Sequence, residues 1–411
     1  MKAISRCRIC DSTELATVLN LGSQALTGVF PKSKSQPVAS GPLEVTKCSA
    51  KSGCGLVQLR HSYDLNELYG MAYGYRSGLN ASMVRHLHSK VQRILETGVL
   101  ASGDLIVDIG SNDSTTLQAY PRGTYELVGV DPTGQKFSHF YPDYIRLIPD
   151  FFSSDVVRAQ FGDRRAKVIT SFSMFYDLED PTAFMKEVAS CLHEEGIWIF
   201  EQSYLPAMLR TNSFDTVCHE HLEFYTLKQI SWMIERAGLK ILDVEFNDVN
   251  GGSFSVTAAR VSSTRTPNAR VIENVRAEEE AMGFDSLVIW EDFQRHISDA
   301  KRALVGFLEE ARVARKRVCG LGASTKGNVL LQYCGITERL LPVIGEVNED
   351  KFGAYTPGTL IPLLREDDVL RSNPDFLLVL PWHFKSFFLK LPKMRGRRLV
   401  FPLPHLEIVE L

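Results

Sequence analysis

Short apolar runs alternate with stretches of helix-spaced apolar positions along most of this chain, which is typical of an α/β protein. Strand-like runs occupy residues 105–110, 127–130, 167–172 and 196–201, and a second group occupies 318–322, 341–346 and 375–380. Between the groups, apolar positions at helical spacing predict one long connector helix from about 286 to 315. We therefore expect an α/β fold with a small N-terminal domain (1–75), a central Rossmann-like domain (76–285), and a connector helix with a C-terminal Rossmann-like domain (286–411).

The junction between the first two expected domains has its own pattern. Residues 69–76 are rich in Gly and Tyr, and their turn residues predict a linker. Residues 82–95 then carry apolar side chains at helical spacing, which predicts a helix with His86 and His88 on its solvated side.

Charge and terminal composition restrict the partners of the protein. The 411 residues include 46 basic and 49 acidic side chains, so the net charge of −3 gives no electrostatic footprint for a nucleic acid. The N-terminus lacks the apolar core of a signal peptide, and no apolar run approaches the length of a membrane span. We expect a cytoplasmic, monomeric protein that acts on a small molecule, with neither nucleic acid nor membrane as a partner.

Four of the eight cysteines lie within the first 54 residues and form a close pair and a wider pair, Cys7 with Cys10 and Cys48 with Cys54. Cytoplasmic thiols stay reduced, and four thiolates on two short loops suit tetrahedral Zn²⁺. A site with four protein ligands has no open position, so the expected zinc ion is structural. The alternative is that these cysteines are four small buried apolar side chains.

The central domain carries the pattern of a nucleoside cofactor. The strand at 105–110 contains Asp108 and ends in Gly110, and the following turn contains Asn112. The next strand ends in Asp131, an acid placed to accept hydrogen bonds from both ribose hydroxyls. The first turn lacks the three glycines of a dinucleotide fingerprint, which favours S-adenosylmethionine (SAM) over NAD.

Three further residues extend the expected cofactor site. Asp150 and Phe151 follow the third strand region and are placed to meet the adenine ring, although Phe151 and Phe152 fit core packing equally well. Ser171 lies at the carboxyl end of the fourth expected strand, the edge that faces a cofactor. Glu201 ends the fifth strand, where a buried carboxylate needs either a role in the site or a salt bridge or cap.

The densest group of acid/base side chains is the run Cys218, His219, Glu220 and His221. Two imidazoles and a carboxylate within three residues suit proton abstraction. The alternatives are polar residues satisfied at an interdomain surface, or a metal site based on the two histidines.

The order of several motifs resembles the SAM-dependent sugar C-methyltransferases, the group that contains the 3-C-methyltransferases of mycarose and tetronitrose biosynthesis. The resemblance extends over essentially the whole chain. The motifs are the four cysteines and residues 73–78, the SAM core, and residues 214–222, 250–253 and 322–328. It implies a substrate of the nucleoside-diphosphate-linked 4-keto-6-deoxysugar class, with methylation at the carbon beside the ketone, C3 rather than C5. Thymidine is the commonest carrier, with guanosine and cytidine left open.

The resemblance also implies roles for individual residues. His221 matches the proposed base, Glu220 the acid that assists or orients it, and His219 a supporting histidine. A base with a pKa near 7 would suit the task. Better-known relatives have Tyr where this chain has Cys218, and a thiol is a poor substitute for a phenol. We expect Tyr204 or Tyr225 to supply any hydroxyl group that the reaction needs.

In the C-terminal domain, Ser324, Lys326 and Asn328 lie at the start of a predicted helix, an arrangement that suits an anion such as the diphosphate of a sugar nucleotide. Glu346 and His383 follow the next two strands, at the same expected edge. The 250–253 segment, with two glycines, is interpreted as a plain turn, and the family resemblance implies that this turn also lies against the sugar. Other functions left open are O- or N-methylation, a dinucleotide-dependent oxidoreductase, and a non-enzymic zinc-dependent binding module.

Overall fold

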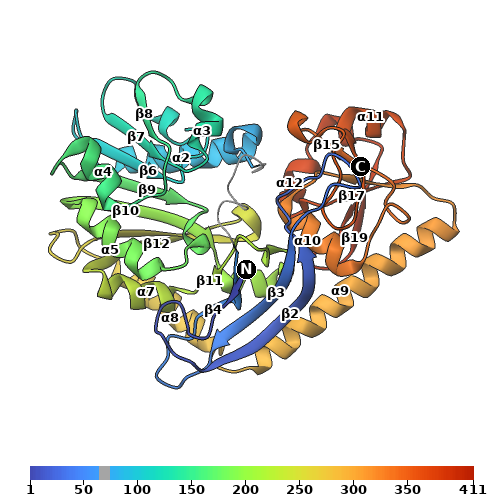
Figure 1. Cartoon of the computed structure of the whole chain (residues 1–411), viewed down its shortest axis with the longest axis horizontal. Helices are drawn as coiled ribbons and strands as arrows, with labels where there is room; N and C mark the ends of the chain where they lie inside the picture. Colours follow the sequence, from blue (N-terminus) through green and yellow to red (C-terminus); the bar gives the residue numbers. More distant parts are fainter. Residues whose placement is uncertain (64–74) are drawn as a thin grey trace.

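The computed structural model in Figure 1 describes residues 1–63 and 75–411 of the chain, so the linker expected at 69–76 lies mostly outside the described residues. A central seven-stranded sheet is the largest element. Its spatial order is β12 (Leu239–Asn247), β13 (Ser253–Arg260), β10 (Leu192–Ser203), β9 (Ala166–Phe172), β6 (Leu105–Ile109), β7 (Glu126–Val130) and β8 (Ile145–Ile148). Strands β8, β7, β6, β9 and β10 are parallel, and β13 runs antiparallel to both of its neighbours.

Alternation along the strands gives the central sheet two apolar faces. Ile106 and Leu127 pack on one face with Val91 and Ile94 of the helix α2, while Val107 and Val128 belong to the cluster on the other face. That second face is covered by helices that include α5, α7 and α8. The helices of this domain are α2 (Ala81–Glu96), α3 (Gly134–Phe137), α4 (Ser154–Phe161), α5 (Pro181–Cys191), α6 (Leu205–Arg210), α7 (Leu227–Arg236) and α8 (Ala269–Ala281).

The order of the central strands determines where a ligand can bind. The chain adds β7 and β8 on one side of β6, and β9 and β10 on the other. The carboxyl ends of β6 and β9 therefore meet at a topological switch point, the usual ligand position in such sheets.

The N-terminal residues form an antiparallel sheet that includes a strand from the central domain. Its order is β11 (Glu223–Phe224), β4 (Val57–Leu59), β3 (Ser40–Cys48) and β2 (Leu15–Ala25), and β1 (Lys2–Ala3) pairs separately with β5 (His61–Ser62). Because only Leu222 separates residue 221 from β11, the histidine motif is fixed to the N-terminal sheet on one side.

The predicted connector helix is confirmed as α9 (Val288–Val313), which runs beside β2 toward the C-terminal sheet (Figure 1). That sheet has the order β16 (Leu363–Arg365), β15 (Ile344–Glu346), β14 (Val318–Leu321), β17 (Phe376–Val379), β18 (Arg398–Phe401) and β19 (Glu407–Glu410), with only β19 antiparallel to its neighbour. Its helices are α10 (Thr325–Cys334), α11 (Glu366–Arg371) and α12 (Lys385–Phe388).

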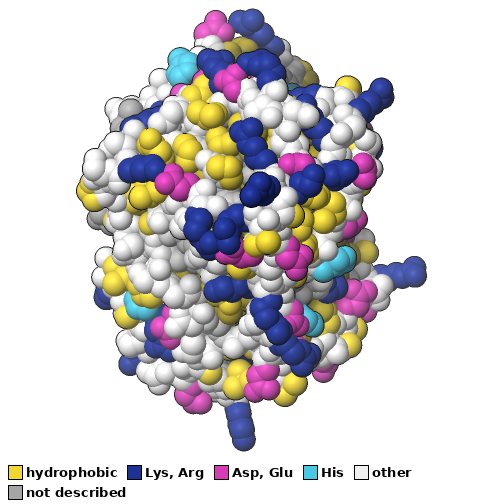
Figure 2. All heavy atoms as spheres, turned by 90° about the vertical axis from the view of Figure 1, so that its right-hand side faces the viewer, with side chains coloured by type: hydrophobic (Ala, Val, Ile, Leu, Met, Phe, Trp, Pro, Cys, Tyr) yellow, Lys and Arg dark blue, Asp and Glu magenta, His cyan; other side chains and the backbone are white. Residues whose placement is uncertain are grey.

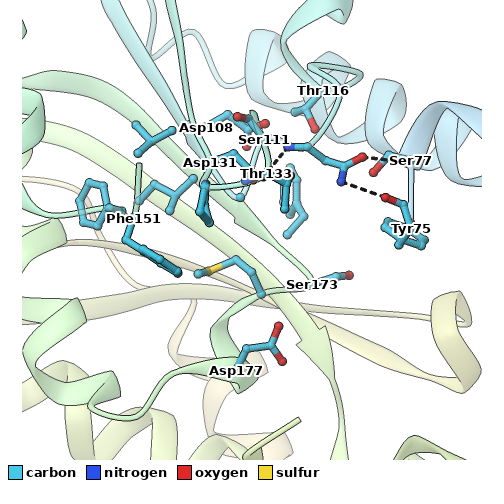
Figure 3. A pocket seen from close by; sticks show the side chains of 18 of the residues that line it. Tyr75, Ser77, Asp108, Ser111, Thr116, Asp131, Thr133, Phe151, Ser173 and Asp177 are labelled. Carbon is cyan, nitrogen blue, oxygen red and sulfur yellow. Dashed lines mark hydrogen bonds between the residues drawn. The ribbon is translucent and has the colours of Figure 1, made fainter. Parts of the chain in front are cut away.

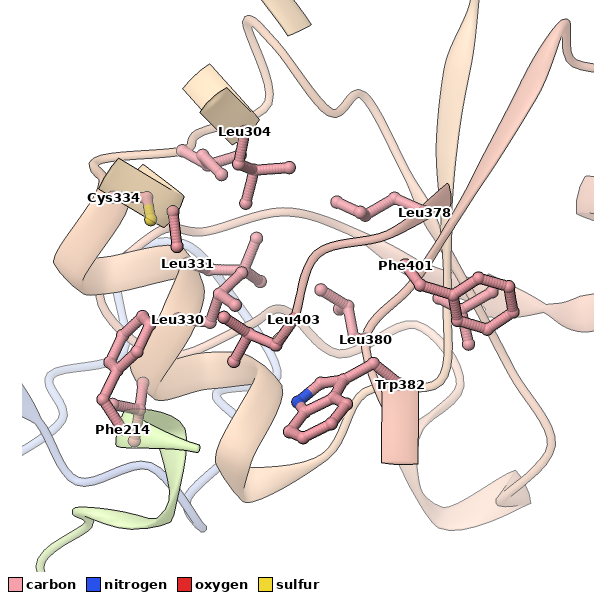
Figure 4. Packing of buried hydrophobic residues seen from close by; sticks show 14 of the residues in the cluster. Phe214, Leu304, Leu330, Leu331, Cys334, Leu378, Leu380, Trp382, Phe401 and Leu403 are labelled. Carbon is pink, nitrogen blue, oxygen red and sulfur yellow. The ribbon is translucent and has the colours of Figure 1, made fainter. Parts of the chain in front are cut away.

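One apolar cluster joins the N-terminal sheet, α9 and the C-terminal sheet. Figure 4 shows Phe214, from the short helix η5 (Phe214–Thr216), beside Leu330 and Leu331 of α10, with Trp382 in the same apolar cluster. The Phe214 ring also lies 5.3 Å from Tyr333, and the Trp382 indole donates a 2.7 Å hydrogen bond to the buried Asp215 carboxylate. The segment that leads into the histidine motif is thus held by the C-terminal domain.

On the outer face of the C-terminal domain, basic and acidic side chains are interspersed (Figure 2). Within residues 1–63 and 75–411, no helix combines the length and apolar character that crossing a lipid bilayer requires.

Candidate active site

The four N-terminal cysteines converge, and all four sulfur atoms lie within 4.8 Å of one another. Sγ–Sγ distances are 3.5 Å for Cys7 with Cys54 and 3.5 Å for Cys10 with Cys48. Four ligands about 2.3 Å from a tetrahedral Zn²⁺ would be separated by about 3.8 Å, so the cluster fits this ion with little adjustment.

Arg8, between the first two cysteines, connects this cluster to the rest of the molecule. Its guanidinium group donates a 2.7 Å hydrogen bond to the carbonyl of Leu59 in β4. Its Nε atom lies 3.4 Å from the Glu179 carboxylate and 3.6 Å from the Glu223 carboxylate of β11. The Arg8 side chain is 3% exposed and that of Glu223 is 0% exposed, so their contact is buried, whereas the Glu179 side chain is 44% exposed.

A pocket opens at the switch point of the central sheet (Figure 3). Asp108, Gly110, Asn112 and Asp131 line it from the ends of β6 and β7, and Phe151 lines it from the loop after β8. Carboxylates and aromatic rings around one cavity suit a cationic nucleoside such as SAM, whose sulfonium is attracted to both.

Backbone geometry explains why the first loop has this form. Gly110 has φ of +71°, and a Cβ atom there would lie 3.0 Å from the Met174 side chain. The Asp131 carboxylate accepts hydrogen bonds from the backbone N–H of Asn112 at 2.7 Å and of Thr133 at 2.6 Å. Burial raises the pKa of Asp131, and it raises the pKa of Asp108 to about 7.

Two residues expected at the cofactor do not line this pocket. Asp150 is exposed and accepts a hydrogen bond from the backbone N–H of Phe151. Ser171 is fully buried and accepts a 3.0 Å hydrogen bond from the Trp198 indole.

Sequence reasoning missed several lining residues, namely Tyr75, Ser77, Ser173, Asp177 and Glu179. The last three follow β9, so the rule that ligands bind at carboxyl ends of strands could have indicated them. In Figure 3, Ser173 and Asp177 lie across the cavity from Asp108 and Asp131.

The residues of the histidine motif point into different surroundings. His219 is completely buried beside the N-terminal sheet, where its Nε2 lies 3.3 Å from the Gly41 carbonyl and its ring meets Tyr63 edge-on. Burial lowers the pKa of His219 to about 4. The Glu220 carboxylate lies 3.4 Å from the Thr27 hydroxyl, and burial raises its pKa.

Of the three residues, only His221 has its pKa affected by Lys326, at the start of α10, so it is the one associated with the junction between the central and C-terminal domains. Its Nδ1 lies 2.7 Å from the Thr216 carbonyl, which can only accept, so Nδ1 carries the hydrogen. The free lone pair is therefore on Nε2. The ring lies 4.3 Å from that of Tyr176. Burial and the positive charge of Lys326 lower the pKa of His221 to about 3, below the value near 7 that would suit a general base.

Lys326 and His383, both expected at the substrate, lie in this junction. The Lys326 ammonium donates a 2.6 Å hydrogen bond to the Asn250 carbonyl, and the Asn250 amide lies 3.5 Å from the hydroxyl of the pocket residue Ser173. Burial and Lys326 hold the pKa of His383 well below its usual value. Burial raises the pKa of Cys218 well above its usual value, and the negative charge of Glu220 adds to this.

Other expected substrate residues have internal partners. The Glu201 carboxylate lies 2.9 Å from the Lys90 ammonium and 2.6 Å from the His86 ring. Of the two alternatives for this residue, a role in the site or a salt bridge, the structure shows a salt bridge. The expectation that His86 faces solvent is wrong, because this buried carboxylate draws the ring inward, while His88 is exposed. The Tyr204 hydroxyl donates to Glu279 at 2.9 Å.

At the start of α10 and beyond β15, three expected residues also bond within the protein. The Ser324 hydroxyl caps α10 by accepting from the backbone N–H of Gly327. The Asn328 amide donates a 2.7 Å hydrogen bond to the Thr27 carbonyl, and the Glu346 carboxylate accepts from the backbone N–H of Ala323.

Three family matches follow one another along the chain. Residues 7–69 match the family described as "Putative zinc binding domain", residues 79–244 the methyltransferase domain, and residues 248–404 the C-methyltransferase C-terminal domain. The C-methyltransferase NovU of Streptomyces niveus is 28% identical over 419 aligned residues, which cover 100% of this chain and 98% of NovU. Together these matches show a C-methyltransferase. This C-methyltransferase is therefore an enzyme, and the resemblance inferred from its motifs is confirmed.

Solved structures resemble only part of this C-methyltransferase. One is a methyltransferase in complex with the Trm112 activator of Haloferax volcanii (14% identity, TM-score 0.35, 44% of this chain and 94% of that chain). Another is magnesium protoporphyrin IX methyltransferase of Synechocystis with bound SAH (14% identity, TM-score 0.33, 44% of this chain and 87% of that chain). Since both TM-scores are below 0.5, the assignment depends on the sequence matches. Those matches, with the pocket and the cysteine cluster, confirm SAM and zinc as the cofactors of this C-methyltransferase.

Proposed function

We propose that this C-methyltransferase acts on a nucleoside-diphosphate-linked 4-keto-6-deoxysugar and methylates C3, the carbon beside the ketone. The observation that carries the proposal is the position of His221. Its unprotonated Nε2 is available at the domain junction, and its ring lies against Tyr176, the residue before the pocket residue Asp177. A base next to a methyl-donor pocket suits carbon methylation, because a C–H bond must be ionised first.

The proton transfer can be followed atom by atom. Nε2 of His221 accepts the proton from C3, and the electrons of the broken C–H bond form the C3–C4 double bond. The carbonyl π electrons move to oxygen and give an enolate. When bound, SAM supplies the electrophilic methyl group that the nucleophilic carbon accepts. The Thr216 carbonyl stabilises the imidazolium, because the Nδ1–H bond to it strengthens when the ring becomes positive.

The low pKa of His221 agrees with this role once the substrate's charge is included. The Lys326 ammonium is one cause of the low value, after burial. A diphosphate or an enolate beside Lys326 would offset this positive charge and raise the pKa of His221 toward the operating pH. The base would thus gain strength when the anionic substrate is bound.

The C-terminal domain provides the second half of the site. Lys326 at the start of α10 and His383 beyond β17 lie at the carboxyl ends of parallel strands, next to the switch point between β14 and β17. We assign the sugar nucleotide to this edge, with SAM in the pocket of the central domain and His221 between them.

The proposal is tested with SAM labelled with ¹³C in the methyl group and a thymidine-diphosphate-linked 4-keto-6-deoxysugar. We expect NMR to show a new methyl carbon bonded to C3. A labelled methyl group on oxygen or nitrogen would refute carbon methylation, and one on C5 would refute the assigned position. Guanosine and cytidine carriers tested in parallel identify the preferred nucleotide.

A further inference from the structure

The replacement of the usual tyrosine by Cys218 leaves the expected site without a phenol at that position. The Cys218 thiol is completely buried, with the Glu220 carboxylate beside it. Tyr204 donates its hydroxyl hydrogen to Glu279 instead. Tyr225 is also completely buried, and the charged groups that affect its hydroxyl include Glu223 and Arg8 at the N-terminal sheet. Neither of the two expected tyrosines therefore serves the domain junction.

Tyr176 is the tyrosine that the structure places against His221. It belongs to the short helix η4 (Phe175–Asp177), which Ser173 and Met174 separate from the carboxyl end of β9. Its ring centroid is 4.3 Å from that of His221, at an interplanar angle of 60°. Its carbonyl accepts a 2.8 Å hydrogen bond from the backbone N–H of Leu222, the residue after His221. Backbone and ring contacts thus fix Tyr176 to the histidine motif.

The Tyr176 hydroxyl is on the cofactor side of this contact. Ser173, Tyr75 and Asp177 are close enough to this hydroxyl to affect its pKa. All three of these residues line the SAM pocket. Burial raises the pKa of Tyr176 well above its usual value, so the phenol keeps its hydrogen and acts as a donor.

We propose that Tyr176 is a further catalytic residue whose hydroxyl donates a hydrogen bond to the keto oxygen of the substrate. The inference rests on the proposed function, because the carbonyl oxygen gains negative charge only when the neighbouring carbon is deprotonated. The proton from carbon goes to His221, and Tyr176 keeps its own proton while it stabilises the enolate oxygen. A donor fixed in advance at a developing oxyanion contributes about 100- to 1000-fold in rate.

The test compares Tyr176→Phe with wild type and with the control Tyr225→Phe, which removes a buried hydroxyl that has no hydrogen-bond partner among the described residues. Each enzyme is incubated in deuterated water with the keto sugar nucleotide and S-adenosylhomocysteine, and NMR follows deuterium uptake at the carbon beside the ketone. Calorimetry gives the Kd of SAM.

We expect Tyr176→Phe to slow deuterium uptake and methylation about 100-fold, while the Kd of SAM stays within about threefold and Tyr225→Phe behaves as wild type. The retained ring keeps the packing on His221, so a purely structural role predicts no such loss. Uptake by Tyr176→Phe within about threefold of wild type would overturn this proposal alone. Failure of wild type to exchange or to form a carbon-bound methyl group would overturn the proposed function, and this inference with it.

Discussion

The Arg8 guanidinium group lies 3.6 Å from the Glu223 carboxylate. This contact joins the Cys7–Cys10 loop of the zinc site to β11, the strand that follows the histidine motif. The same Nε atom lies 3.4 Å from Glu179, a residue of the SAM pocket. The metal cluster, the cofactor pocket and the segment that carries His221 thus meet at one buried side chain.

Loss of zinc should therefore loosen the histidine motif. In Cys10→Ser, one of four ligands is missing, and we expect zinc content to fall and amide hydrogen exchange at residues 219–225 to accelerate at least about tenfold. Elemental analysis and exchange mass spectrometry measure the two effects. The matched control is Cys191→Ser, a buried cysteine outside the cluster. Unchanged exchange in zinc-free Cys10→Ser would show that the metal does not support the motif.

The pocket predicts which acidic residue matters for SAM. Asp131 lines it and holds two backbone N–H groups of its walls, whereas Asp150 is exposed outside it. We expect Asp131→Asn to weaken SAM binding about 10- to 100-fold, the range for a lost hydrogen bond to a charged group, and Asp150→Asn to leave it unchanged. Calorimetry measures the Kd of SAM for each variant. Equal losses would mean that the cofactor extends beyond this pocket.

The Lys326 charge predicts a pH effect. Burial and Lys326 hold the pKa of His221 at about 3, so removal of the ammonium in Lys326→Met should raise this pKa, by on the order of 1 unit. Because the base is then protonated at higher pH, the acid limb of the deuterium-uptake profile should shift upward. NMR titration of the His221 ring provides an independent value. The control is Lys390→Met, which changes an exposed lysine. If the His221 ring titrates at the same pH in both variants, the Lys326 charge does not lower the pKa of His221.

Much of the architecture could be predicted because the pattern is strong where elements are long or buried. The apolar stripe of α9 predicted its bounds to within about two residues, and the strand ends at Gly110 and Asp131 indicated the pocket. The rest depended on long-range contacts without a local signal. The His86 ring is oriented by its hydrogen bond to the Glu201 carboxylate, which lies 115 residues later in the sequence. The His219 ring contacts the Gly41 carbonyl, which lies 178 residues earlier. Tyr176 escaped notice because η4 is too short to show a period.

The central claim is that His221 removes the proton from the substrate carbon. Deuterium uptake into the keto sugar nucleotide, followed by NMR with S-adenosylhomocysteine present, measures that step without methyl transfer. Loss of a general base predicts a decrease of about 1000-fold in His221→Asn, while His88→Asn, which changes an exposed histidine of α2, should match wild type. If His221→Asn incorporates deuterium at the wild-type rate, another group is the base and the mechanism is wrong.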